Sequence, residues 1–285
     1  MTRIVHVNGD ELAEDQAKVS VFDRGFLMAD GVYEVTSVLG GKLVDFPGHL
    51  ARLGRSLGAL KIANPHTDEE WLAIHRRMVE SNGIDEGLVY LQVTRGNPGD
   101  RDFAWVEGVA PTVVLFTQSK PGLADSPQAR DGIRVIMLPD LRWRRRDIKT
   151  VQLLAPSLAK MEAKAQGADD AWLIEEGVIT EGTSNNAWIV KDGRIVTRGL
   201  STDILHGITR AAVMRLAAEA QMTVEERGFT PEEARAADEA FVTSASAFVM
   251  PVVEIDGARL GDGRPGPVAR RLREIYLEDA RASAL

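Results

Sequence analysis

The chain contains no cysteine, and only 6% of its 285 residues are aromatic. The absence of thiols excludes disulfides, cysteine nucleophiles and cysteine-ligated metals. No stretch approaches the roughly 18 consecutive apolar residues of a membrane-spanning helix. The opening residues, MTRIVHVNGDELAED, also lack the apolar run of a signal peptide. We therefore expect a cytoplasmic protein that does not bind a membrane.

Positive charge is not in excess either, because the net charge is −8. The one dense basic run, at residues 142–146, is too local to form the extended positive surface that binds a nucleic-acid backbone. We expect no nucleic-acid partner. Hydrophobic residues make up 44% of the chain, which is enough for the buried cores of two domains.

Hydrophobic periodicity and turn dipeptides predict a mixed α/β fold. Strands are expected where β-branched and apolar residues gather, at residues 4–7, 32–39, 42–46, 87–95, 112–117, 133–138, 171–174, 187–190 and 240–243. Hairpin turns are predicted at Asn8-Gly9, Gly40-Gly41, Glu176-Gly177 and Asp192-Gly193. Helical spacing of apolar residues predicts helices after Pro47 and at residues 71–79, 153–166, 209–220 and 267–278.

The segment from Gln118 to Gly132 has the composition of an exposed connector, with two prolines, two glycines and mostly polar residues. We therefore predict two domains. An N-terminal α/β domain covers residues 1–120, a linker covers 121–131, and a C-terminal α/β domain with the candidate lysine described below covers 132–285.

Several common catalytic motifs are missing. The five histidines show no metal-binding spacing, so no metal site is expected. Neither a Gly-x-Ser-x-Gly elbow nor a Walker loop occurs, which removes the serine-hydrolase and P-loop interpretations. Lysine chemistry remains as the candidate.

Lys149 is the lysine whose position stands out, since it follows the polar run RRRD and precedes the apolar-rich VQLLAP. Burial at such a transition would lower the pKa of the amine and make it a better nucleophile. A lysine that merely extends its charge to solvent from such an edge is the alternative. Lys149 alone leaves both interpretations open.

Glu181 begins the run EGTSNN at the end of a predicted strand. A pyridine-based cofactor needs a carboxylate of this kind, because the carboxylate keeps the ring nitrogen protonated and able to withdraw electrons. The alternative is a surface residue in a turn.

Three features indicate a phosphate site. Ile208 and Thr209 open a predicted helix, where free amides and the helix dipole favour an anion. The run Ser244-Ala245-Ser246 supplies hydroxyl groups after a strand. Arg52 would supply the cation, although a solvated surface arginine is the alternative.

In their order and spacing these segments resemble the fold-type IV pyridoxal-phosphate enzymes, specifically the D-amino-acid transaminase branch. The resemblance extends through nearly the whole chain and rests on FDRGFLMADGVYEV, HLARL, QVTRG, DIKTVQLLAPSLAK, TEGTSNN, HGITR and FVTSASAF. Lys149 and Glu181 are 181 − 149 = 32 residues apart, as the hairpin geometry of the family leads us to expect.

The resemblance implies a homodimer in which pyridoxal 5′-phosphate lies at the interface of two domains. Lys149 would carry the cofactor as a Schiff base and shuttle the proton, and Glu181 would pair with the pyridinium nitrogen. The phosphate would be held by Arg52, Ile208, Thr209, Ser244, Ala245 and Ser246. A ping-pong reaction would then move an amino group from a D-amino acid to a 2-keto acid.

The substrate-binding residues match the D-amino-acid branch only in part. Tyr33 and Arg101 correspond to two residues that bind the substrate carboxylate in that branch. Phe103 stands where a histidine is expected, in a loop one residue longer. Its apolar ring implies a modified carboxylate site or a site for amines without a carboxylate. Phe248 and Met250 also depart from the family pattern, and we expect a core role for both.

The leading prediction is therefore a D-amino-acid transaminase, and an (R)-selective amine transaminase is the alternative that Phe103 favours. An aminodeoxychorismate lyase of the same fold is a third possibility, against which the Thr-Ser-Asn run after Glu181 argues mildly. A branched-chain aminotransferase and a catalytically silent cofactor-binding protein complete the alternatives. The silent protein would show no change of cofactor absorbance with any amine.

Overall fold

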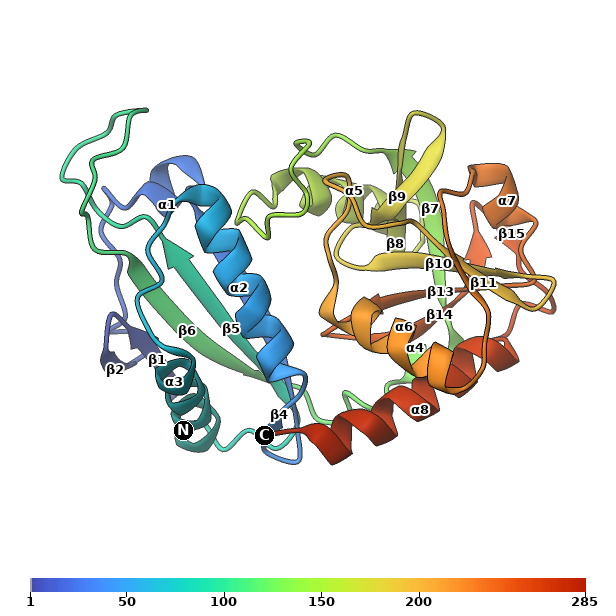
Figure 1. Cartoon of the computed structure of the whole chain (residues 1–285), viewed down its shortest axis with the longest axis horizontal. Coiled ribbons are helices and arrows are strands. Elements are labelled where there is room, and N and C mark those ends of the chain that lie inside the picture. The colour runs from blue at the N-terminus through green and yellow to red at the C-terminus, as the bar shows by residue number, and fades with distance from the viewer. Residues whose placement is uncertain (1) are drawn as a thin grey trace. The chain divides into compact units, whose positions relative to one another are not determined.

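The computed structural model describes residues 2–285 and consists of two compact units (Figure 1). The first unit contains the chain up to Leu123 together with Ile148–Gln152 and Ser283–Leu285. The second contains Ala124–Asp147 and Leu153–Ala282. Neither unit is therefore a single continuous piece of the chain.

A six-stranded antiparallel sheet with the order β2-β1-β6-β5-β3-β4 forms the base of the first unit. Its strands are β1 (Ile4–Val7), β2 (Asp10–Ala13), β3 (Gly31–Leu39), β4 (Lys42–Leu43), β5 (Gly87–Thr94) and β6 (Thr112–Ser119). The turn between β3 and β4 uses Gly40 and Gly41, whose φ angles are 58° and 72°. Glycine adopts such angles without steric cost, which explains the predicted turn.

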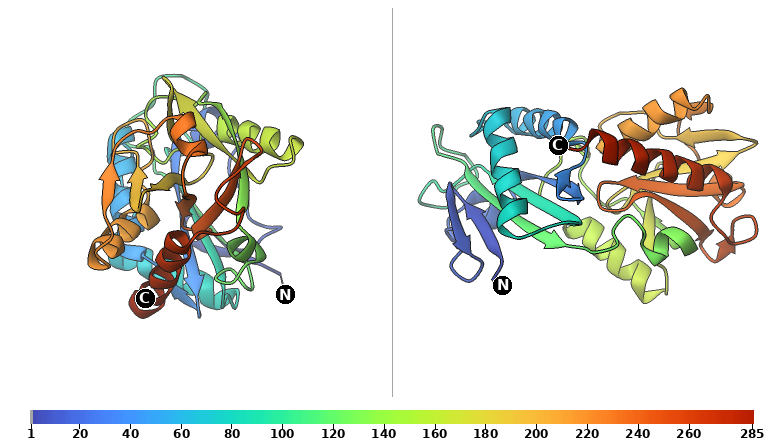
Figure 2. Two further views of the ribbon diagram at one scale, coloured as in Figure 1. Left: turned by 90° about the vertical axis from the view of Figure 1, so that its right-hand side faces the viewer. Right: turned by 90° about the horizontal axis from the view of Figure 1, so that it is seen from below.

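Two helices cover one face of this sheet, and a short helix precedes β3 (Figures 1 and 2). The helices are α1 (Arg24–Met28), α2 (Phe46–Leu60) and α3 (Asp68–Ser81). Leu53 and Leu57 of α2 and Trp71 of α3 are buried in the core between the helices and the sheet. Burial of each large apolar side chain contributes about 1.5–3 kcal/mol and fixes α2 above β3.

The second unit contains a nine-stranded mixed sheet, with the order β12-β11-β10-β13-β14-β7-β8-β9 and β15 paired to β14. Its strands are β7 (Ile133–Pro139), β8 (Asp170–Glu175), β9 (Val178–Gly182), β10 (Asn186–Lys191), β11 (Arg194–Thr197), β12 (Val224–Glu226), β13 (Glu239–Ser244), β14 (Phe248–Ile255) and β15 (Ala258–Arg259). Parallel pairs join β7 to β8, β7 to β14 and β11 to β12.

The helices of the second unit are α4 (Pro127–Asp131), α5 (Leu154–Ala165), α6 (Ile208–Glu219), α7 (Pro231–Arg235) and α8 (Pro267–Ser283). Helix α5 packs on β7 and β8, and α6 packs on β12 and β13. The core contains Trp172, whose ring centroid lies 6.0 Å from that of Phe229.

The mixed α/β prediction is confirmed, with differences at several elements. The strand predicted at residues 42–46 ends at Leu43, because α2 begins at Phe46 with Pro47 in its first turn. Strand β14 was missed, since its continuous apolar run does not alternate. The core role predicted for Phe248 and Met250 is confirmed, because both side chains are buried.

The position of Lys149 differs from the domain prediction. The segment Ile148–Gln152 belongs to the first unit rather than with the rest of the C-terminal half. Its backbone pairs with β3, since Tyr33 N–H donates to the Lys149 carbonyl at 3.0 Å and Val151 N–H donates to the Gly31 carbonyl at 3.1 Å. Within the predicted linker, the structure contains helix α4, and the burial of Ala129 ties it to the second unit.

None of the helices formed by residues 2–285 has both the length and the apolar character needed to cross a membrane. The cytoplasmic location stays a prediction.

Candidate active site

Lys149 is half-buried beside strand β3 in the first unit. Its backbone N–H donates to the Ser56 hydroxyl at 3.3 Å, and its carbonyl accepts from Tyr33 N–H. The Nζ atom lies 4.0 Å from the centroid of the Tyr33 ring. A cation at this distance from an aromatic face is attracted by the ring. The segment is therefore fixed by backbone hydrogen bonds, and the amine is directed to Tyr33.

Arg52 is held in the core of the first unit by Glu34, whose carboxylate also contacts His49. The Nε and Nη2 atoms of Arg52 donate to the two carboxylate oxygens of Glu34 at 2.8 and 2.7 Å, and His49 Nδ1 lies 2.8 Å from Glu34 Oε2. Burial would raise the pKa of Glu34, but the Arg52 charge outweighs burial and holds this pKa far below its usual range. The solvated-arginine alternative is wrong, because Arg52 is only 4% exposed.

Arg101 and Phe103 lie together on the loop that connects β5 to β6. The Arg101 guanidinium carbon is 5.2 Å from the centroid of the Phe103 ring. The ring is 79% exposed, so most of its apolar surface faces solvent in the single chain. Large exposed aromatic side chains are typical of surfaces that contact a ligand or another protein.

Glu181 lies on β9 in the second unit and is 3% exposed, so the surface-turn alternative is wrong. Three donors converge on its carboxylate. Arg142 Nη1 donates to Oε1 at 2.6 Å, Asn186 Nδ2 donates to Oε2 at 3.0 Å, and Leu205 N–H donates to Oε2 at 3.1 Å. Burial raises the pKa of Glu181, while Arg142 and the Leu205 N–H oppose this shift.

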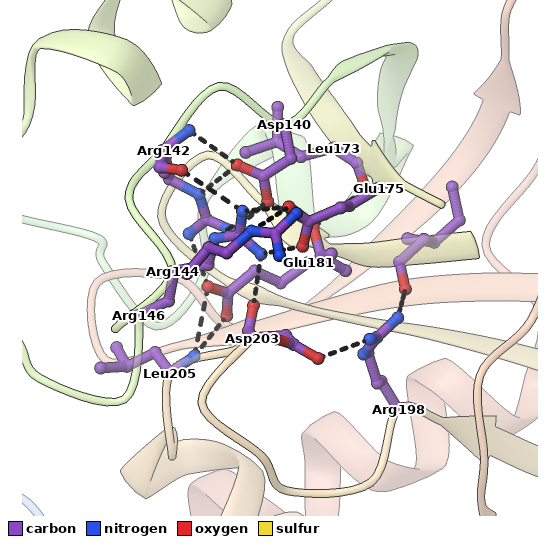
Figure 3. A network of polar contacts seen from close by, with 12 residues as sticks. Asp140, Arg142, Arg144, Arg146, Leu173, Glu175, Glu181, Arg198, Asp203 and Leu205 are labelled. Atoms are coloured by element: carbon purple, nitrogen blue, oxygen red, sulfur yellow. Dashed lines mark hydrogen bonds and ion pairs between the residues drawn. The ribbon is translucent and has the colours of Figure 1, made fainter. Parts of the chain in front are cut away.

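Arg142 is part of the polar network drawn in Figure 3 and is itself held by Asp140. Burial would raise the pKa of Asp140, but the hydrogen bonds and charge of Arg142 keep this pKa below its usual value. A second arginine, Arg146, is buried and pairs with Glu175 at 2.7 Å. Two arginines of the basic run are therefore internal, where their charges are paired.

The segment between Glu181 and helix α6 offers an anion-binding end. Asn186 Nδ2 also donates to the Leu205 carbonyl at 3.0 Å, which joins the carboxylate to the approach of α6. Gly207 precedes the helix and gives it no side-chain cap. A Cβ atom on Gly207 would clash with Asn186 Oδ1, so only glycine fits there. Thr209 is buried in the first turn of α6.

Ser244, Ala245 and Ser246 form the turn between β13 and β14. Register pairs Ser244 with Phe248, and the Ser244 and Ser246 hydroxyl oxygens are 3.5 Å apart. Helix α6 packs on β13, whose Thr243 is paired with Asn186 of β10. The second unit thus combines a buried carboxylate, a helix N-terminus and a hydroxyl-bearing turn on neighbouring elements.

Within the part of the chain that the structure describes, no group of three or more histidine, aspartate or glutamate side chains is placed to hold a metal ion.

Comparisons with known proteins place this arrangement in a family. The model of the family described as amino-transferase class IV matches residues 31–255. A D-alanine aminotransferase of Staphylococcus haemolyticus is 37% identical over 273 residues, which cover 95% of this chain and 96% of that protein. One from Bacillus licheniformis is 36% identical over 266 residues, covering 93% of each. The chain belongs to the class IV aminotransferases.

Solved structures agree with this class IV aminotransferase fold. A branched-chain aminotransferase of Thermoproteus uzoniensis, solved with norvaline, has a TM-score of 0.88 and 27% identity, covering 99% of this chain and 96% of that one. The branched-chain amino acid aminotransferase of Thermobaculum terrenum, solved in its PLP form, has a TM-score of 0.85 and 23% identity, covering 99% and 94%. The fold-type IV prediction is confirmed, and the cofactor of class IV aminotransferases is pyridoxal 5′-phosphate.

Sequence reasoning missed several residues that support the candidate side chains of this class IV aminotransferase. Glu34, Asp140 and Arg142 make the buried ion pairs described above, and Asn186 links Glu181 to the approach of α6. Asn186 lay inside the quoted TEGTSNN motif, and Arg142 began the basic run. The pairings themselves join segments far apart in the chain and leave no local signal.

Proposed function

We propose that the chain is a D-amino-acid transaminase that transfers the amino group of its donor to a 2-keto acid. The observation that carries this proposal is the similarity to D-alanine aminotransferases over nearly the full length of both chains. The placement of Lys149 Nζ over the Tyr33 ring supports it, because Tyr33 is one of the two substrate residues expected in this branch.

The side chains of the second unit fit the two ends of the cofactor. Glu181 would accept a proton-bearing pyridine nitrogen, because its carboxylate is buried and held by three donors. At the other end, the first amides of α6 at Ile208 and Thr209 and the turn from Ser244 through Ala245 to Ser246 would bind the phosphate. When bound, pyridoxal phosphate supplies an electron sink for the bond broken at the substrate α-carbon.

In the first unit, Lys149 would bind the cofactor through Nζ and then carry a proton at Nζ to and from the substrate α-carbon. Its fixed backbone would keep the amine within reach in both half-reactions. Arg52 would direct its charge to the phosphate, and Glu34 would orient the guanidinium by its two hydrogen bonds.

Tyr33 and Arg101 would bind the substrate carboxylate. The guanidinium of Arg101 can present two parallel N–H groups to a carboxylate, which gives orientation as well as charge. Phe103, against which Arg101 packs, would narrow the range of donors by placing an aromatic ring next to this carboxylate site.

A second candidate is an (R)-selective amine transaminase. The large exposed surface of Phe103 favours it, because an apolar ring would accept the side group of an amine that has no carboxylate.

Mixing the yellow holoenzyme in turn with D-alanine, L-leucine and (R)-phenylethylamine would separate these functions. We expect D-alanine to convert the cofactor to its pyridoxamine form fastest, as followed by the loss of the visible band. A response to L-leucine alone would contradict the D-amino-acid proposal. A response to the amine but not to D-alanine would favour the second candidate.

We also propose that the active protein is a homodimer. Leu154, Leu158 and Met161 recur at helical spacing on α5, and they are 75%, 63% and 61% exposed. Three large apolar side chains on one helix face support a contact with a second copy. Light scattering of the wild-type protein should give the mass of two chains, and Leu158→Glu should shift it towards one. A single-chain mass for the wild type would contradict the proposal.

A further inference from the structure

The segment Asp23-Arg24-Gly25 belongs to the first quoted motif, but no chemical step described above uses it. It forms the start of α1 in the first unit. All three residues make contacts with the end of β5 or with the loop that follows it, at residues 97–110. Arg101 and Phe103, the candidate substrate residues, lie on this loop.

Asp23 and Gly25 fix α1 against the end of β5. The Asp23 carboxylate accepts from Gly25 N–H at 2.8 Å and from the Thr94 hydroxyl at 2.9 Å. A Cβ atom on Gly25 would clash with Thr94 Cγ2, so glycine is required for this approach. Arg24 N–H donates to the Gly96 carbonyl at 3.0 Å. The start of α1 is therefore locked to the point where the loop begins.

The Arg24 side chain then reaches the loop itself. Its Nη1 donates to the Asp102 carbonyl at 2.5 Å, and its Nη2 donates to the Phe103 carbonyl at 3.3 Å. Its Nε donates to Asp30 Oδ2 at 2.7 Å. Arg24 is 6% exposed, so these charge-assisted bonds form away from solvent, where they are strongest. Each of the three guanidinium nitrogens has an acceptor.

Asp30 joins Arg24 to a second arginine, Arg95. Arg95 donates from Nε to Oδ2 of Asp30 at 2.7 Å and from Nη2 to Oδ1 at 3.0 Å. Its guanidinium carbon also lies 4.3 Å from the centroid of a ring of Trp105, further along the loop. The two arginines thus hold the loop at Asp102, Phe103 and Trp105.

We propose that Arg24 is a specificity-positioning residue, which holds the loop at residues 97–110 so that Arg101 keeps the direction needed to bind the substrate carboxylate. The inference rests on the proposed function, because it takes Arg101 as the carboxylate ligand. A lysine would keep the charge beside Asp30 but would lack the planar fork that reaches two successive carbonyls.

The test compares Arg24→Met and Arg24→Lys with a matched control, Arg77→Met, which removes an exposed arginine paired with Glu11 on the same unit. Steady-state kinetics with D-alanine are measured on the holoenzymes. Hydrogen exchange of peptides covering residues 97–110 is followed by mass spectrometry. We expect both Arg24 variants to raise the KM for D-alanine about tenfold with kcat changed less than about twofold, and loop amides to exchange about tenfold faster.

A fall of kcat with unchanged KM, or loop exchange equal to that of Arg77→Met, would overturn the proposal. Arg24→Lys keeps the test open if Arg24→Met does not fold. If the wild type does not accept D-alanine, the proposed function fails, whereas the exchange measurement still decides whether Arg24 holds the loop.

Discussion

Replacing Lys149 with alanine is expected to abolish transamination. The amine is the one group in the site whose proposed role requires both binding to the cofactor and transfer of a proton at the substrate α-carbon. General acid–base catalysis alone is worth about 10²–10⁴-fold in rate, so kcat should fall by at least this factor. The fold should survive, because the hydrogen bonds that fix this segment use the backbone of Lys149 rather than its side chain.

The measurement is kcat for D-alanine together with mass spectrometry of borohydride-treated holoenzyme. The wild type should show the cofactor mass on the peptide that contains Lys149, and Lys149→Ala should show it on none. Lys164→Ala is the matched control, since this lysine lies exposed on α5. Cofactor attached to another lysine in Lys149→Ala, with turnover retained, would contradict the assignment.

Glu181→Gln should produce the second largest loss, with kcat reduced by about 10²–10³-fold, as for removal of one preorganised electrostatic group. A glutamine amide carries no charge with which to keep a pyridine nitrogen protonated. It also brings an NH₂ group into a site where Arg142, Asn186 and Leu205 already donate. One of these donors therefore loses its acceptor, which adds a stability cost of about 1–3 kcal/mol.

Stopped-flow measurement of the D-alanine half-reaction would record this loss, while the visible band should persist because Lys149 is intact. Glu175→Gln is the control. Glu175 belongs to the same network and pairs with Arg146, but it makes no contact with Glu181 among the ion pairs of the network (Figure 3). An equal loss in both variants would mean that the network supports the fold rather than the chemistry, and full activity of Glu181→Gln would remove its proposed role.

Periodicity predicted most of the long elements, because these obey one pattern over several turns. The leucines of α2 and the alternation of β5 are examples, and both elements occur within two residues of their predicted bounds or start signal. Short elements such as α1 and α7 escaped, because five residues carry too little periodicity to be recognised. Strand β14 escaped because it is buried along almost its whole length and so does not alternate.

The candidate side chains were found from motif order, whereas their supports were not. Arg52 illustrates the reason. Its helix position favours a solvated side chain, and only the pairing of α2 with β3 brings the Glu34 carboxylate to it. Arg142 is similar, since a run of arginines indicates a charged surface until the fold places Asp140 and Glu181 around one of them. Buried ion pairs depend on tertiary packing and leave no mark in local sequence.

The division of the chain has a consequence for how its halves can be separated. Lys149 lies on five residues, Ile148–Gln152, which belong to the first unit although the sequence on both sides belongs to the second. The last residue, Leu285, likewise exchanges two backbone hydrogen bonds with Leu43. A gene cut after Leu123 would leave the first fragment without its lysine segment and without this terminal pairing. Neither half can be inherited, expressed or recombined as an independent module, because each unit is completed by distant residues of the same chain.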